Sequence, residues 1–241
     1  MFDDAHWAEV PAVADGVTRL AGMDFYGETP ETSLKSPPKA LDICCGFGRI
    51  SAELARMGYA VTGVDITESY LRTAREEAAH ENLEIEYIHS DAREFTRSDF
   101  FDVALNLYNS FGYFADQNDD LRIARNAYNS LKKGGCFIIE IFGKEVTVRD
   151  FIEAEWFERA GFTVLTKYKI LDSWTLLHNR WILIKDGMKI EKKFSYRLYS
   201  AAELRSLILE AGFSKVDIFG DWDGCPYDQY ANKLIVIGRK L

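Results

Sequence analysis

A chain of 241 residues with 47% hydrophobic and 28% charged side chains has the composition of an ordinary globular protein and is long enough for one large domain. Its 38 acidic and 29 basic residues give a net charge of −9, which argues against DNA or RNA as a partner because an acidic surface repels phosphate backbones. No apolar run approaches the roughly 18 residues of a membrane span, and the N-terminal residues lack a signal-peptide pattern. We therefore expect a cytoplasmic protein without a membrane partner.

The four cysteines do not have the spacing of a metal site. Cys44 and Cys45 are adjacent within an apolar run, and Cys136 and Cys225 are isolated. We expect four reduced thiols and no bound metal.

The first predicted element is a helix over Trp7–Leu20, which we assign, with the rest of residues 1–38, to an N-terminal helical cap. Strands and helices then alternate, which predicts right-handed crossovers and a doubly wound, mostly parallel, Rossmann-like α/β sheet. The expected strands are Ala40–Cys45, Ala60–Val64, Ile85–His89, Phe101–Leu107 and Cys136–Phe142, and the expected helices carry Ile50, Leu54 and Met57, then Leu71, Ala74 and Ala78, and finally span Asp119–Leu131.

The pattern becomes β-rich after Glu155. Asp186-Gly187 predicts a tight hairpin, because type I′ turns need positive φ at two successive residues. We expect residues 155–199 to form an inserted antiparallel β-sheet that serves as a lid or as a segment for homodimer formation. Its predicted strands are Thr163–Asp172, Trp174–Lys185 and Lys189–Tyr199.

The α/β pattern returns at the end of the chain. Ser200 and Glu203 form a capping box for a further helix. Strands at Val216–Phe219 and Leu234–Ile237 then complete a sheet of seven strands. The main domain is therefore expected to comprise residues 39–154 and 200–241.

The segment ALDICCGFGRISAELA is a strand, a glycine-bearing turn and the start of a helix. Gly46 and Gly48 permit a tight turn and the close approach of a ligand, and the free N–H groups at the helix start favour an electron-rich group. Asp65 ends the next strand, where a carboxylate can accept hydrogen bonds from both hydroxyls of a ribose. A dinucleotide fingerprint would need glycines at the positions of Cys44 and Arg49. The pattern therefore favours a nucleoside ligand over a dinucleotide.

These residues resemble the class I S-adenosylmethionine-dependent methyltransferases, over about residues 38–142 and again at 200–240. The run from Asp42 to Gly48 is similar to the family's first motif, D/E-x-G-x-G-x-G, with Cys44 in place of the first glycine. That replacement makes the backbone less free at this position. The resemblance implies S-adenosylmethionine as the cofactor.

The resemblance also assigns cofactor contacts along the chain. It implies that the motif holds the methionine part of the cofactor, that Asp65 binds the ribose and that Ile66 lies beside the adenine. Asp91 and Ala92 match the pair that recognises the adenine edge. The complete predicted cofactor set is Asp42, Cys44, Gly46, Gly48, Arg49, Asp65, Ile66, Tyr70, Asp91, Ala92, Arg93, Asn106 and Leu107.

The acceptor side of the site is predicted from the loop LYNSFGYFAD, residues 107–116. Tyr108, Asn109 and Tyr113 are the candidate catalytic residues, because their hydroxyls, amide and aromatic faces could stabilise a cationic centre. An amine acceptor needs only to be neutral, whereas a hydroxyl or carbon acceptor requires a base. Because the motifs contain no evident His/Glu pair, we expect a small-molecule acceptor, with N-methylation preferred.

Further substrate contacts are expected from the insertion and the C-terminal turn. His178, Arg180, Arg197, Tyr199 and Tyr227 are the candidates, and two arginines could hold a carboxylate. Three alternatives stay open, namely methylation of a peptide or protein, a nicotinamide-dependent oxidoreductase, and a binding protein that retains the fold without the activity.

Overall fold

The computed structural model describes residues 7–23 and 36–241. Parts of the predicted cap, residues 1–6 and 24–35, lie outside the described residues. The predicted N-terminal helix is α2, Val10–Ala21, and Gly22 ends it in the left-handed conformation with φ of 77°. Its buried residues include Val13 and Val17, so one face of α2 joins the core.

A mixed seven-stranded sheet forms the centre of the molecule, in the order β10-β11-β5-β4-β1-β2-β3. Strands β1 to β5 are parallel to one another where they pair, and β11 is antiparallel to both β5 and β10. The predicted doubly wound, mostly parallel sheet is thus confirmed. The strands are β1 Lys39–Ile43, β2 Ala60–Asp65, β3 Ile85–His89, β4 Phe101–Asn106, β5 Leu131–Ile141, β10 Lys215–Phe219 and β11 Leu234–Arg239.

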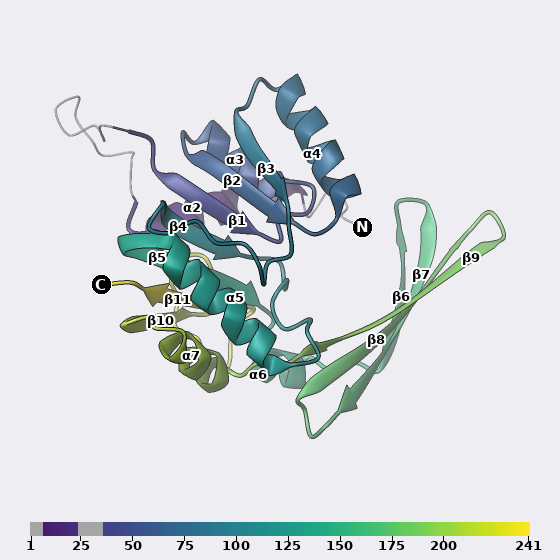
Figure 1. Ribbon diagram of the computed structural model, residues 1–241. Coiled ribbons are helices and arrows are strands. Elements are labelled where there is room, and N and C mark those ends of the chain that lie inside the picture. Colours follow the sequence, from purple (N-terminus) through teal and green to yellow (C-terminus); the bar gives the residue numbers. More distant parts are fainter. Residues whose placement is uncertain (1–6, 24–35) are drawn as a thin grey trace.

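Helices cover both faces of this sheet (Figure 1). Helices α5 and α7 lie over one face, where they pack on Ala104 and Phe137, and α2 and α3 lie over the other, where they pack on Leu105 and Ile138. Alternate residues of β4 and β5 point to opposite faces, so the strands are buried on both sides. The helices are α3 Arg49–Arg56, α4 Glu68–His80, α5 Gln117–Ser130, α6 Lys144–Arg149 and α7 Ala201–Glu210.

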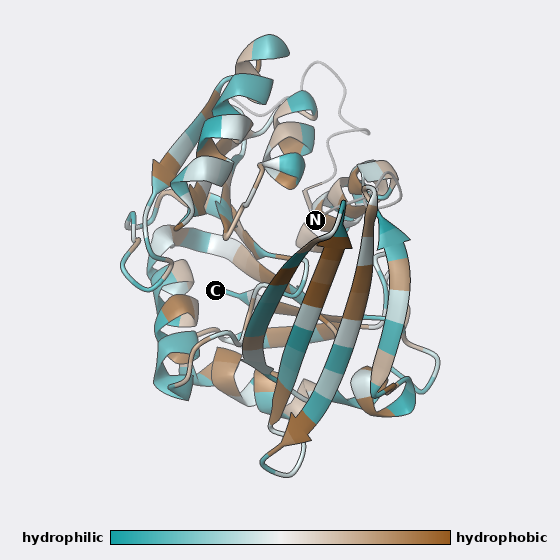
Figure 2. Cartoon of the chain, turned by 90° about the vertical axis from the view of Figure 1, so that its right-hand side faces the viewer, coloured by the Kyte–Doolittle hydropathy of each residue, from teal (hydrophilic) through white to brown (hydrophobic). Residues whose placement is uncertain are grey.

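A second sheet of four antiparallel strands, in the order β6-β7-β8-β9, projects from the main domain (Figures 1 and 2). Figure 2 shows this sheet standing in front of the larger one. The sequence predicted three of its strands and missed β6. The predicted turn is confirmed, since Asp186 and Gly187 have φ of 50° and 75°. The strands are β6 Ala154–Arg159, β7 Phe162–Leu171, β8 Leu176–Lys185 and β9 Met188–Arg197.

In the main domain, one predicted boundary was wrong and one helix was missed. Strand β5 begins at Leu131, directly after α5, and not at Cys136. Helix α6 was not predicted, because six residues are too few for an apolar periodicity. In the part of the chain that the structure describes, no helix is both long and apolar enough to cross a membrane.

Candidate functional site

The chain reverses its direction of winding between β1 and β4, which are adjacent in the sheet. In open α/β sheets, ligands bind outside the carboxyl ends of the strands at such a point. A cavity of about 80 Å³ lies there. It is lined by Asp42, Cys44, Cys45, Gly46, Phe47, Arg49, Ile50, Leu107, Tyr108 and Ser110.

The turn after β1 contains three residues with positive φ, Cys44 at 63°, Gly46 at 57° and Gly48 at 73°. A Cβ on Gly46 would meet nothing within 4 Å, so this glycine leaves open room beside the turn. A Cβ on Gly48 would instead collide with the hydroxyl of Tyr87. The sequence analysis gave both glycines the same role, whereas the structure shows that Gly48 makes room for a protein side chain.

Asp65 connects the turn to the following helix. Its Oδ2 accepts a hydrogen bond from the Gly46 N–H at 2.9 Å, and its Oδ1 accepts one from the Thr67 N–H at 2.8 Å. Beyond it, Ile66 is 63% exposed, and the rings of Tyr70 and Phe47 are 4.3 Å apart. The carboxylate and these apolar side chains thus lie at one edge of the sheet.

Two buried polar groups face the turn from inside. The Asp42 carboxylate accepts a hydrogen bond from Ser51 Oγ at 2.6 Å, and burial raises its pKa to about 6. Asn106, at the end of β4, donates its amide to the Ile43 carbonyl. Its Oδ1 is buried and has no hydrogen-bond partner among the described residues. Buried acceptors of this kind favour a ligand that donates hydrogen bonds or carries positive charge.

Asp91 lies at the same edge, two residues after the end of β3. It binds Arg93 through a salt bridge of 2.6 Å, and Arg93 also contacts Asp119 at 3.0 Å. The Arg93 guanidinium lowers the pKa of the Asp91 carboxyl, which stays ionised. Ala92, between Asp91 and Arg93 in the sequence, is half-buried.

The loop after β4 begins with two strained residues, since Tyr108 and Asn109 have φ of 55° and 58°. The buried Glu140 holds both, because its carboxylate accepts the Tyr108 N–H at 2.6 Å and its carbonyl accepts the Asn109 N–H at 3.1 Å. The Arg49 guanidinium lies 4.5 Å from the centre of the Tyr108 ring. Tyr108 therefore borders the turn after β1.

Tyr113 points the other way, toward the four-stranded sheet. Its ring lies 5.5 Å from Tyr196 and 6.1 Å from Phe194, centre to centre. Partial burial raises the pKa of the Tyr113 hydroxyl, the Asn109 side chain lowers it, and Cys44 of the turn raises it further. Tyr113 therefore lies against the four-stranded sheet.

The other predicted substrate residues do not form one group at Tyr113. His178 binds Ser195 and Arg180 binds Glu191, on the face of the sheet opposite to Phe194 and Tyr196. Tyr199 is buried with its hydroxyl on Asp120, and Tyr227 donates to Glu145. Arg197 lies beside Asp120, four positions along the strands from Arg180, so the two arginines do not form the predicted clamp.

Known proteins resemble this chain in sequence and in fold. Residues 40–135 match the family model of the methyltransferase domain. This segment is a methyltransferase domain, and the chain has the fold of the class I S-adenosylmethionine-dependent methyltransferases. YqeM of Bacillus subtilis, which carries a provisional methyltransferase name, is 23% identical, and the alignment covers 95% of each chain.

Two further methyltransferases illustrate the range of relatives. The ubiquinone biosynthesis O-methyltransferase of Ruegeria pomeroyi is 33% identical over 58% of this chain and 60% of that protein. The structure of the sugar N-methyltransferase KedS8 from Streptoalloteichus is similar in fold, with a TM-score of 0.71, 17% identity and coverage of 99% of this chain and 93% of that one.

The groups at the carboxyl edge of the main sheet suit S-adenosylmethionine. Asn106 Oδ1, which has no partner within residues 7–23 and 36–241, and the buried Asp42 carboxylate suit an ammonium group and a sulfonium. Gly46 leaves open room beside the turn. The sequence analysis missed Ser51, Glu140 and Tyr87, which support the turn and the loop. Their side chains act through contacts between distant segments, for which no local motif exists.

The aromatic residues of β9 were also missed. Phe194 and Tyr196 are two positions apart, so they share one face of the strand. That spacing was visible in the sequence, but the side of the sheet that faces the methyltransferase domain was not.

Proposed function

We propose that this methyltransferase transfers a methyl group to the amine nitrogen of a small-molecule acceptor that binds against the rings of Tyr113, Phe194 and Tyr196. The observation that carries the proposal is the aromatic group of Tyr113, Phe194 and Tyr196. Tyr113 belongs to the same loop as Tyr108, which borders the predicted cofactor turn. S-adenosylmethionine supplies an electrophilic methyl group when it is bound.

The proposed cofactor contacts follow from the donors and acceptors at the sheet edge. Asp42 and Asn106 would hold the ammonium group of the cofactor's methionine part. This group offers positive charge and N–H donors to the two buried acceptors. Asp65 would accept hydrogen bonds from the ribose with the lone pairs that Gly46 and Thr67 leave open. The remaining proposed contacts are Cys44, Gly48, Arg49, Ile66, Tyr70, Asp91, Ala92, Arg93 and Leu107.

The aromatic group favours an amine acceptor. Aromatic faces stabilise a cationic centre by about 0.5–2 kcal/mol, and positive charge develops on nitrogen as the methyl group arrives. A neutral amine attacks without losing a proton first. A site with aromatic rings and the Asn109 amide can therefore serve it without a general base. The fold neighbour KedS8 is named as a sugar N-methyltransferase, which supports this choice. The proposed location of the protein is the cytoplasm.

A screen for methyl transfer tests the proposal. Amines, phenols and peptides are offered in parallel with S-adenosylmethionine, and turnover is measured as S-adenosylhomocysteine released. We expect turnover with amines. Turnover with phenols or peptides and none with amines would reject the proposed acceptor class while leaving the methyltransferase assignment intact.

Variants of the aromatic group locate the acceptor. Tyr113→Ala and Phe194→Ala should raise the KM of the acceptor by about tenfold, because each removes a ring worth roughly 1–2 kcal/mol of contact. Their affinity for S-adenosylhomocysteine should stay within about twofold of the parent protein. His178→Ala, on the opposite face of the sheet, is the matched control and should change neither value.

A further inference from the structure

Asp120 is a buried carboxylate that the sequence did not mark as a site residue. It lies in the first turn of α5 and is fully shielded from solvent. Its Oδ2 accepts a hydrogen bond from Tyr199 Oη at 2.7 Å, and Arg197 Nε lies 3.9 Å from the same oxygen. Burial raises the pKa of Asp120 to about 6, while Tyr199 and Arg197 act in the opposite direction.

Asp120 is not needed to start its helix. Asp116 is the N-cap of α5 and accepts the Asn118 N–H at 2.9 Å. Asp119 supplies a further negative charge at this end and pairs with Arg93. Stabilisation of the helix start therefore does not offset the free energy cost of burying the Asp120 carboxylate.

Arg197 connects Asp120 to the loop that carries Tyr113. The side chain of Arg197 is only 14% exposed, and its Nη2 donates to the Ala115 carbonyl at 3.3 Å. Its backbone N–H donates to the Gly112 carbonyl at 2.7 Å. One residue at the end of β9 thus holds the loop on both sides of Tyr113.

Gly112 allows this close approach. Its φ is 95°, and a Cβ at this position would lie 2.8 Å from the Arg197 carbonyl oxygen. The loop can therefore lie against β9 only with glycine at this point. The same strand carries Phe194 and Tyr196, which contact the Tyr113 ring.

We propose that Asp120 is a positioning residue that, through Arg197, fixes residues 112–115 against β9 and so holds the Tyr113 ring on Phe194 and Tyr196. The negative charge of Asp120 orients the guanidinium, and the guanidinium holds the loop. The link between Asp120 and the loop is a property of the fold, and only the effect on the acceptor rests on the proposed function.

Hydrogen exchange of Asp120→Asn tests the link. Asparagine keeps the shape and can still accept from Tyr199, but it loses the charge that faces Arg197. We expect amide exchange at residues 111–116 and at Arg197 to become at least tenfold faster, with the strands of the main sheet unchanged. Affinity for S-adenosylhomocysteine should stay within about twofold.

Tyr199→Phe is the matched control. It removes the other contact of Asp120 but leaves the carboxylate opposite Arg197. Exchange at residues 111–116 should therefore stay at the parent rate. If Tyr199→Phe accelerated exchange in the loop as much as Asp120→Asn, general loosening of the core would explain both, and the proposal would be overturned.

Arg197→Lys keeps the proposal testable if Asp120→Asn does not fold. Lysine retains a positive charge but lacks the planar fork that reaches both Asp120 and Ala115. Faster exchange confined to the loop supports the proposal, and unchanged exchange overturns it.

Kinetics separate this link from the proposed function. With an amine acceptor from the screen, Asp120→Asn should raise the acceptor KM by about tenfold and leave the KM of S-adenosylmethionine unchanged. Faster loop exchange with an unchanged acceptor KM would support the link between Asp120 and the loop, and would count against an acceptor site at Tyr113.

Discussion

At the scale of a single residue, Asp65 supports the turn in addition to its proposed contact with the ribose. Its two oxygens already accept hydrogen bonds from Gly46 and Thr67, so the carboxylate shapes the turn before any ligand arrives. The sequence analysis assigned it only to the ribose. A substitution at this position therefore removes a contact to the proposed ligand and a support of the turn at once.

Asp65→Ala should weaken binding of S-adenosylhomocysteine by about 1–3 kcal/mol, because charge-assisted hydrogen bonds are lost. It should also lower the free energy of unfolding of the ligand-free protein, since two backbone N–H groups lose their acceptor. Isothermal titration and chemical denaturation measure the two effects. Glu68→Ala, which removes a carboxylate on the exposed side of α4, is the control and should leave affinity unchanged. Unchanged affinity in Asp65→Ala would contradict the ribose role.

Asp42 predicts how binding depends on pH. Burial raises its pKa from 3.8 to about 6, so the folded protein binds a proton between these values that the unfolded chain has lost. The ligand-free protein should therefore lose stability as the pH rises from about 4 to 6, by roughly 3 kcal/mol at most.

A ligand whose ammonium group lies at Asp42 reverses this balance by favouring the ionised carboxylate. Binding of S-adenosylhomocysteine should weaken below about pH 6, by up to tenfold per pH unit, as Asp42 becomes protonated. Titrations between pH 5 and 8 give the profile. In Asp42→Asn the affinity should be lower and flat across this range. A parent profile that is already flat would show that Asp42 does not face the ligand's charge.

At the scale of elements, the sequence predicted the parts of the fold that have a local signal. The hairpin at Asp186-Gly187 and the capping box of Ser200 and Glu203 were both confirmed, because each depends on residues that contact one another within a few positions. Strand β6 was missed because Trp156, on its outer face, is 69% exposed, so no alternation marks the strand as half-buried.

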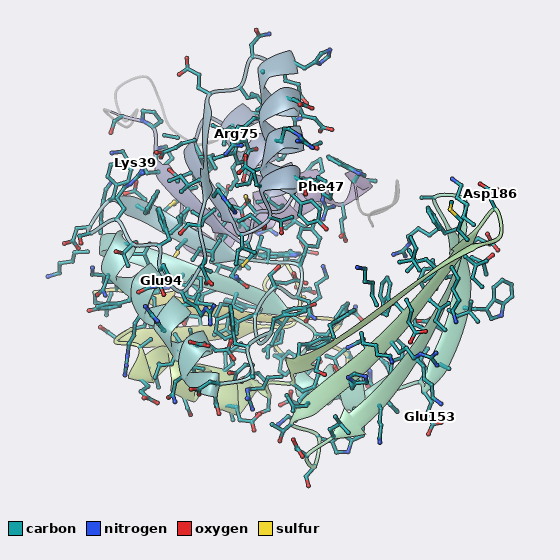
Figure 3. The ribbon with its side chains drawn as sticks, turned by 45° about the vertical axis from the view of Figure 1, so that its right-hand side comes forward. Lys39, Phe47, Arg75, Glu94, Glu153 and Asp186 are labelled. Carbon is teal, nitrogen blue, oxygen red and sulfur yellow. The ribbon has the colours of Figure 1, made fainter. Side chains whose placement is uncertain are left out.

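The hairpin between β8 and β9 offers a test of element stability. Gly187→Ala should lower the free energy of unfolding by about 1 kcal/mol, because alanine is strained at φ of 75°. Affinity for S-adenosylhomocysteine should not change. The hairpin at Asp186 lies at the opposite end of the four-stranded sheet from Arg197, where β9 returns to the main domain (Figure 3). Thermal and chemical denaturation of Gly187→Ala and of Asp186→Gly, which permits the same turn, give the comparison. Equal stability of Gly187→Ala and the parent protein would contradict the turn geometry.

At the scale of the whole molecule, the predictions divide along the two sheets. The predicted cofactor residues follow successive parallel strands. Parallel strands bring their carboxyl ends to one edge, so residues such as Asp42, Asp65 and Asp91 could be placed together from sequence alone. The acceptor side depends on which face of the second sheet turns toward the main domain. Arg180 and Phe194 come from the same sheet and lie on opposite faces, and no local pattern distinguishes the two faces in advance.

Ligand binding should stabilise the whole chain and discriminate between cofactor classes. A ligand at 100 times its Kd stabilises the folded state by about 2.7 kcal/mol, and each kcal/mol shifts the Tm of a protein of this size by roughly 2–4 °C. We therefore expect S-adenosylhomocysteine at such a concentration to raise the Tm by about 5–10 °C in a thermal-shift measurement. NADH should leave the Tm unchanged, because Cys44 and Arg49 occupy the positions where a dinucleotide turn has glycine, and Asp42 repels a diphosphate. Asp42→Asn should reduce the shift by S-adenosylhomocysteine without creating one by NADH. A shift with NADH that equals the one with S-adenosylhomocysteine would overturn the assignment of the site to a single nucleoside.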